Sequence, residues 1–226
     1  MVHKKIAERA APRPRGRPRA YDADAALAQA MAAFWRLGYS ATSLEQLSDA
    51  TDMNRPSLYA AFGDKRALYL QTLDSYTERS KQAIVKALDP QLSLAEGLQR
   101  FYDSAIAGYL PSGDPARGCY LIGTAVTEAL ADEEIRTRLA SALRDFERLL
   151  EARIRKARDD GEIDAASDPQ ALAMIASAVL YTMAIRSRAG ESRTLLRSLA
   201  KTAIDLICGR APARKRRRAQ GRRSAC

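Results

Sequence analysis

The chain has 226 residues, 46% of them hydrophobic, which suits one mid-sized domain or a small domain joined to a larger one. Its three cysteines form no close pair and its single histidine stands at position 3, which argues against a disulfide framework, a zinc site and a histidine-based catalytic triad. Of the net charge of +10, residues 1–21 carry +6 and residues 209–226 carry +8, which leaves −4 for the part between them.

Two basic ends therefore flank an acidic middle. Residues 1–20 are rich in proline, arginine and alanine and are predicted to be a disordered arm, and residues 209–226 are predicted to be a disordered tail. Such arms fit a polyanionic partner, and the alternative is solvated charge without a partner. In the segment GRPR, Arg17 and Arg19 are suited to a DNA minor groove, because arginine favours narrow, electronegative grooves.

The first predicted helix begins with Asp22 as its N-cap and runs to about Leu37, where Gly38 ends it. Its apolar residues recur every three or four positions, as in a helix with one buried face. Trp35 lies near its end and is expected to pack against the next domain; the alternative is a binding role.

The next segment contains two short helices joined by a tight turn. Thr42 and Glu45 are predicted to form a capping box at the start of the first of these helices. Asn54 is a suitable N-cap for the second helix, and Pro56 stands in its first turn, where a missing N–H costs nothing. A short second helix with a polar leading edge suits the major groove of DNA, so the pattern indicates a helix-turn-helix.

The run NRPSLYAAFGDKRALY, preceded by GYSATSLEQL, resembles the DNA-binding domain of the tetracycline-repressor (TetR) family of bacterial transcription regulators. The resemblance is specific over roughly residues 16–69, and beyond them only length and helical layout match. Asp52 stands in the turn where the family usually has glycine. Aspartate tolerates the left-handed conformation at a cost of roughly 1 kcal/mol, so the motif survives this substitution.

The resemblance implies two sets of DNA contacts. Arginine is suited to bidentate contact with guanine, whereas phosphate contacts fix the register without reading the sequence. The residues implied to face base edges are Arg55, Pro56, Ser57 and Ala61, and those implied to hold phosphates are Thr42, Ser43, Tyr59 and Lys65.

The rest of the chain is also predicted to be helical, and no strand, internal repeat or heptad array is visible. The fold class is therefore all-α with about nine helices, divided into a helix-turn-helix domain of three helices (residues 21–65) and an effector-binding and dimerisation domain (residues 66–208). The helices predicted after the helix-turn-helix span about 64–88, 93–109, 119–130, 132–159, 168–188 and 192–207.

Residues 171–185 are apolar almost all round, so their helix must be covered on both sides. The short loop at Gly190 makes this helix an antiparallel hairpin with the last one. The TetR resemblance implies that two such hairpins form a homodimer interface through the helices near 168–188 and 192–207. The alternative is a fully buried central helix in a monomer.

Aromatic and apolar residues of the middle helices can line a small-molecule cavity or simply fill the core, and periodicity does not separate these possibilities. The resemblance favours a cavity, because TetR-like regulators commonly bind an effector between these helices. The candidate ligand-binding residues are Phe101, Tyr102, Ile106, Cys119, Gly123, Thr127, Phe146 and Ile175. Cys119 stands at a helix start that can lower a thiol pKa, so it is either a redox or electrophile sensor or a small buried hydrophobe.

The sequence thus predicts a ligand-responsive transcription regulator, a homodimeric repressor released from a palindromic DNA operator by a small molecule. The alternative is an architectural DNA-binding protein without an effector, which compacts DNA with its basic tails. No residue pattern indicates catalysis, a cofactor or a metal. The chain shows neither a secretory signal nor an apolar run of about 20 residues, so a cytoplasmic protein is expected, and the resemblance places it with the bacterial nucleoid rather than the membrane.

Overall fold

The computed structural model describes residues 22–113 and 115–209, and within these ranges it contains nine α-helices, one π-helical segment and no strand. This confirms the predicted all-α class. The predicted arms, with Arg17 and Arg19, lie outside the described residues.

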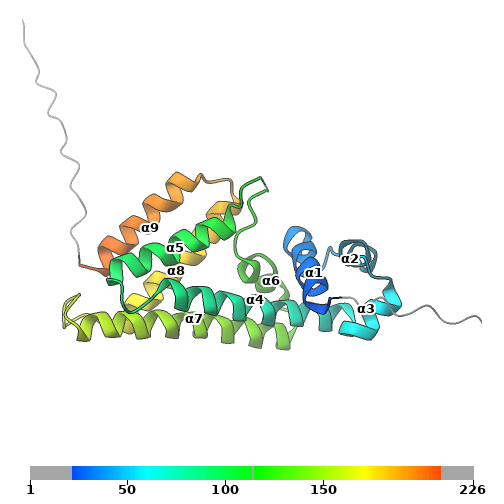
Figure 1. Cartoon of the computed structure of the whole chain (residues 1–226), viewed down its shortest axis with the longest axis horizontal. Coiled ribbons are helices and arrows are strands. Elements are labelled where there is room, and N and C mark those ends of the chain that lie inside the picture. Colours follow the sequence, from blue (N-terminus) through cyan, green and yellow to red (C-terminus); the bar gives the residue numbers. More distant parts are fainter. Residues whose placement is uncertain (1–21, 114, 210–226) are drawn as a thin grey trace, which may run out of the picture.

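The first three helices form a small head at one end of the molecule, and the remaining helices form an elongated body (Figure 1). As predicted, Asp22 caps the first helix, because its carboxylate accepts hydrogen bonds from the N–H groups of Asp24 and Ala25 at 3.0 and 3.1 Å. The head helices are α1 (Ala23–Leu37), α2 (Leu44–Thr51) and α3 (Arg55–Phe62).

The capping box of α2 lies one residue later than predicted. Ser43, not Thr42, is the N-cap, and its hydroxyl accepts from the N–H of Gln46 while the Gln46 side chain accepts from the N–H of Ser43. The Thr42 side chain is instead buried and donates to the carbonyl oxygen of Gly38 at 2.5 Å. Burial of Thr42 therefore decides between two overlapping capping patterns.

The turn between α2 and α3 has the predicted chemistry. Asp52 adopts the left-handed conformation, with φ 50° and ψ 33°, and its N–H donates to the carbonyl of Ser48. Asn54 caps α3 by accepting from the N–H of Ser57 at 2.9 Å, and Pro56 stands in the first turn. These contacts shape the turn that sets the direction of α3 relative to α2.

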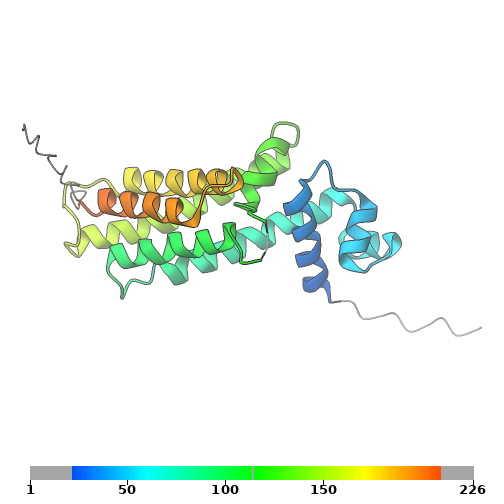
Figure 2. The same cartoon turned by 90° about the horizontal axis from the view of Figure 1, so that it is seen from above.

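A single long helix joins the head to the body. Helix α4 begins at Lys65, with Asp64 as its N-cap, and continues without a break to Ala87, across the predicted domain boundary. Helix α4 packs against α1 of the head and against α5 and α7 of the body. The long helices of the body run roughly side by side (Figure 2). The main body helices are α4 (Lys65–Ala87), α5 (Leu94–Tyr109), α7 (Glu133–Asp159), α8 (Pro169–Arg188) and α9 (Arg193–Ile207).

The predicted single helix at 119–130 is irregular. It consists of a π-helical segment, η1 (Leu121–Ala125), followed by the short α6 (Val126–Glu128). Within it, the buried Thr124 hydroxyl donates to the carbonyl of Tyr120 at 2.8 Å and accepts from Tyr69 of α4 at the same distance. Such π-segments are often found at functional sites.

Trp35 packs against the body, as predicted. Its ring lies 5.3 Å from that of Tyr76 and 5.4 Å from that of Tyr120, measured between centroids. Its indole N–H donates to the carbonyl of Arg117 at 3.0 Å. The Trp35–Tyr76 pair is edge-on, an arrangement that adds to the stabilisation from buried area.

Helix α8 is not fully buried in the protomer, so the buried-monomer alternative for this helix is wrong. One side, including Ala176, Leu180 and Met183, packs into the body, while Met174 and Ile185 are more than half exposed. The helix is long and apolar enough to pass as a membrane span by composition, yet it packs against α5, α7 and α9. Packing within the protomer therefore covers the inner side of α8 and leaves its apolar outer side exposed.

Candidate nucleic-acid interface and internal cavity

Helix α3 presents a continuous outer face. Leu58 and Phe62 are buried in the head core, so that most of the side chains between them face outward. Of the residues predicted to face bases, Arg55 and Pro56 are exposed, whereas Ser57 and Ala61 are half-buried. Tyr59, predicted to hold phosphate, is 46% exposed.

Sequence reasoning missed Ala60, which is also exposed on this outer face. It stands four residues after Pro56, and residues at this spacing share a helix face. Helical spacing alone could have found it.

The residues flanking α3 differ in accessibility. Ser43 is exposed at the start of α2, so its N-terminal turn is open to a phosphate, whereas the buried Thr42 hydroxyl is not. The Lys65 ammonium lies 4.5 Å above the ring of Tyr39 and 3.5 Å from the carbonyl oxygen of Ser40. This contact holds Lys65 beside the turn before α2.

Charged contacts also tie the head end of α4 to the start of α7. Arg66 donates to both carboxylate oxygens of Asp132, at 2.5 and 2.9 Å, and lies 2.8 Å from Glu134. These hydrogen bonds hold the pKa of Asp132 well below its usual range. Close by, Ser40 donates to Glu128 of α6 at 2.8 Å. A shift of α6 or α7 would therefore move the residues at the head end of α4 and the turn before α2.

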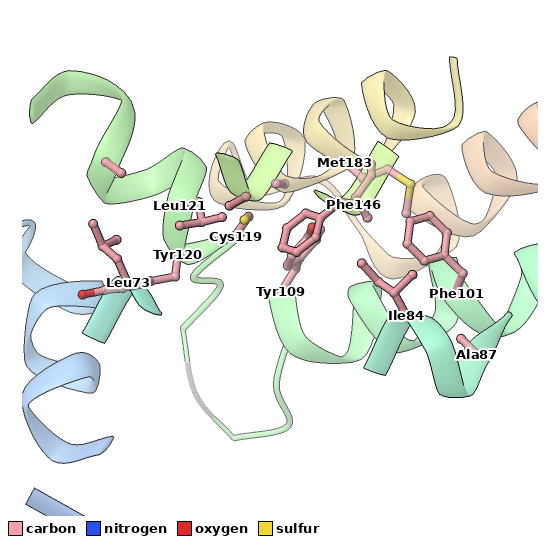
Figure 3. Packing of buried hydrophobic residues seen from close by; sticks show 14 of the residues in the cluster. Leu73, Ile84, Ala87, Phe101, Tyr109, Cys119, Tyr120, Leu121, Phe146 and Met183 are labelled. Carbon is pink, nitrogen blue, oxygen red and sulfur yellow. The ribbon is translucent and has the colours of Figure 1, made fainter. Parts of the chain in front are cut away.

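The body contains a largely apolar cavity of about 290 Å³ bounded by α4, α5, α7, α8 and the end of α1. Three of the predicted ligand-binding residues, Phe101, Cys119 and Phe146, line it, and Figure 3 shows them with Tyr109 and Ile84 on the surrounding elements. Further lining residues are Met31, Trp35, Tyr76, Arg79, Ser80, Ala83, Ser104, Ala105, Gly108, Leu121, Leu143, Leu180 and Tyr181.

The other five predicted ligand-binding residues lie outside this cavity. Tyr102 and Ile106 are buried on the side of α5 that packs against neighbouring helices, and the Tyr102 hydroxyl donates to the carbonyl of Ala176 at 3.0 Å. Thr127 and Ile175 are exposed on the outside of the body. Gly123 contacts Arg188 instead, whose guanidinium donates to the Gly123 carbonyl at 3.0 Å.

Phenol groups that the sequence did not single out surround the Cys119 thiol. The Tyr76 hydroxyl donates to the sulfur at 3.4 Å, and Tyr109 is fully buried beside it. Tyr181 also lines the cavity, and burial raises the pKa of its hydroxyl. The cavity thus combines apolar walls with a few polar groups, the pattern of a small-molecule site.

Burial raises the pKa of the Cys119 thiol, although the Tyr76 hydroxyl opposes this shift. The neutral thiol therefore dominates at neutral pH, contrary to the lowered pKa expected for a helix start.

We predict that iodoacetamide at pH 8 alkylates Cys119 at least about tenfold more slowly than the half-exposed Cys208, with a rate that rises as the pH exceeds the usual thiol pKa of about 8.5. Peptide mass spectrometry over time measures this, and equal or faster labelling of Cys119 would favour a sensor.

A second apolar surface lies on the outer side of α8 and α9. On α8 it comprises Met174, Ile175, Ala178 and Ile185, at helical spacing, and on α9 it includes Leu195 and Leu206. We call these residues the α8–α9 face. Met174, Ile175, Ile185 and Leu206 are each between 47% and 62% exposed. Exposed apolar residues gathered on two neighbouring helices often mark a protein–protein interaction site.

Two regions of the chain match known families. Residues 26–72 match the family described as bacterial regulatory proteins, tetR family, and residues 95–203 match the tetracyclin repressor-like C-terminal domain. Over 192 residues the chain is 34% identical to the HTH-type transcriptional repressor ComR of Escherichia coli, covering 85% of this chain and 91% of ComR. The chain belongs to the TetR family. Its DNA-binding and C-terminal regions are thus both those of a transcription regulator.

Two further transcription regulators extend the comparison. The chain is 31% identical over 107 residues to the HTH-type transcriptional repressor BdcR of Escherichia coli, covering 47% of this chain and 54% of BdcR. A cysteine mutant of the TetR family regulator CifR, solved with a 26-base-pair double-stranded operator DNA, superposes with a TM-score of 0.76 at 32% identity, covering 84% of this chain and 98% of CifR. The same arrangement of head and body is therefore known in a DNA complex.

Proposed function

We propose that this protein is a cytoplasmic, homodimeric repressor that binds a two-fold DNA operator through α3 and leaves it when a small molecule occupies the body cavity. The observation that carries the proposal is the connection between the two sites. Helix α4 lines the cavity with Tyr76, Ser80 and Ile84 and reaches the head at Lys65 without a break. A ligand that moves α4 therefore moves α3.

The proposed base-reading residues are Arg55, Pro56, Ser57, Ala60 and Ala61. Ser43, Tyr59 and Lys65 are proposed to hold phosphates, and Arg17 and Arg19 to follow the minor groove. Thr42 is left out, because its hydroxyl is buried and already bonded. The proposed effector is a largely apolar molecule with a polar group that matches the phenols around Cys119.

The proposed dimer uses the α8–α9 face. Its outer residues are apolar or small and uncharged along most of both helices, which favours contact with an identical face on a second copy. Two heads joined in this way would present two α3 helices to one face of the DNA. A dimer of this kind requires half-sites about one DNA turn apart, ~34 Å, or an equivalent spacing.

Arg55 tests the proposed base reading. Arg55→Ala should weaken operator binding by roughly 1–3 kcal/mol and relax the preference at one base of each half-site, because a bidentate contact to guanine is lost. Affinities are compared on operator and scrambled DNA, with the exposed Arg100→Ala on α5 as the control. An equal loss on both DNAs would show that Arg55 contacts phosphate only.

A further inference from the structure

A second cavity, of about 460 Å³, lies between the head and the body, and the charged residues in the described part of its lining are all arginines. Arg36 comes from the end of α1, Arg117 from the loop after α5, and Arg188 from the end of α8. Gln29 and Trp35 of α1 add an amide and an indole, and none of the lining residues that the structure describes carries a carboxylate.

These arginines differ from most others in the described part of the chain. Arg66, Arg138 and Arg155, for example, each pair with a carboxylate. Among the described residues no carboxylate lies within ion-pair distance of the three cavity arginines, and the one side-chain hydrogen bond found for them runs from Arg188 to the carbonyl of Gly123. Like charges that line one cavity repel each other, and a bound anion would lower that repulsion.

Arg117 adds a more specific signal. Its guanidinium carbon lies 4.9 Å from the centre of the Trp35 ring, so that the cation sits over the indole. Its Nε is buried without a hydrogen-bond partner. A buried guanidinium N–H left unpaired costs free energy that a bound acceptor would recover. The guanidinium fork matches carboxylate and phosphate oxygens in particular.

We propose that this cavity binds a small organic anion, a carboxylate or phosphate carried on a flat apolar group. Arg36, Arg117 and Arg188 hold the charge, and the flat group lies beside Trp35, next to the Arg117 guanidinium that covers its ring. The site is separate from the apolar cavity of the body, although Trp35 borders both. Because its walls come from the head and from the body, a bound anion would also link the two.

Trp35 is the only tryptophan of the chain, so its fluorescence reports directly on this site. Full-length protein is titrated at constant ionic strength with benzoate, with phenyl phosphate and with the uncharged benzamide. We expect a saturable change with at least one anion and at least about tenfold weaker binding of benzamide, because a charge-assisted hydrogen bond is worth more than a neutral one. The ratio of the two anion affinities identifies the preferred acid group.

Variants separate this site from the body cavity. Arg36→Gln and Arg188→Gln change exposed side chains and should each weaken anion binding about tenfold, whereas Arg100→Gln on α5 should leave it unchanged. Calorimetry provides a second readout that does not depend on Trp35. No saturable response to either anion, equal binding of benzamide, or equal behaviour of all three variants would overturn the proposal. A different result would also overturn it. If Arg36→Gln and Arg188→Gln kept their anion binding but bound the operator more weakly and with a shallower salt dependence, the arginines would contact DNA phosphates instead.

Discussion

Ala178→Arg should yield a folded monomer that binds its operator at least roughly 100-fold more weakly than the wild type, because a buried unpaired charge costs several kcal/mol. Ala178 is exposed in the protomer, in the middle of the α8–α9 face, so the arginine does not disturb the core of the single chain. In a symmetric dimer the two arginines would approach each other across the two-fold axis. Each monomer would then contact only one half-site.

Sedimentation and circular dichroism separate the possible outcomes of this experiment. The control is Val85→Arg, which places the same charge on an apolar residue of α4 that is 57% exposed and outside the α8–α9 face. We expect Val85→Arg to remain dimeric and Leu206→Arg on α9 to dissociate like Ala178→Arg. A folded Ala178→Arg dimer with unchanged affinity would rule out α8 as the interface.

Filling the body cavity should abolish the response to the effector. Ala105 of α5 lines the cavity and is half-buried, so Ala105→Trp replaces much of the free volume with an indole. Gly123 is unsuitable for this purpose, because a Cβ there would lie 2.1 Å from the Arg188 guanidinium and outside the cavity. The matched control is Ala107→Trp, on the exposed side of the same helix.

The test uses any compound that a screen finds to release the protein from its operator. By linkage, operator DNA must weaken binding of that compound by the same factor as the compound weakens DNA binding, about 5–150-fold for typical couplings. Ala105→Trp should lose this binding, and Ala107→Trp should keep it. Identical compound affinity with and without operator, or a wild-type response of Ala105→Trp, would show that the cavity is not the switch.

Local sequence chemistry was sufficient to predict most of the fold. The N-caps Asp22 and Asn54 follow from side chains that satisfy nearby backbone groups, and Asp52 follows from a side chain that tolerates an unusual φ. The error at the start of α2 arose because Thr42 with Glu45 and Ser43 with Gln46 both fit a capping pattern. Only tertiary burial of Thr42 separates them.

The cavity was harder to predict, for a physical reason. Helical periodicity tells which side of α5 faces inward, but not where neighbouring helices leave a space, so Ile106 was chosen although it packs tightly and Ala105 was missed. The wide turn of η1 is likewise not encoded in an apolar repeat. The three cavity arginines stand far apart in the sequence, and only the fold brings Arg36, Arg117 and Arg188 together.

Selection from random-sequence DNA with the full-length protein, followed by footprinting of the enriched sites, tests the central claim most directly. A TetR-family repressor that reads DNA through α3 should enrich one sequence with two-fold symmetry and protect two half-sites about one helical turn apart, ~34 Å, or at an equivalent spacing. Arg55→Ala should lose that enrichment. Binding that enriches no sequence, with protein coverage that grows with the length of the DNA, would contradict the central claim. It would indicate an architectural protein that acts through its basic tails.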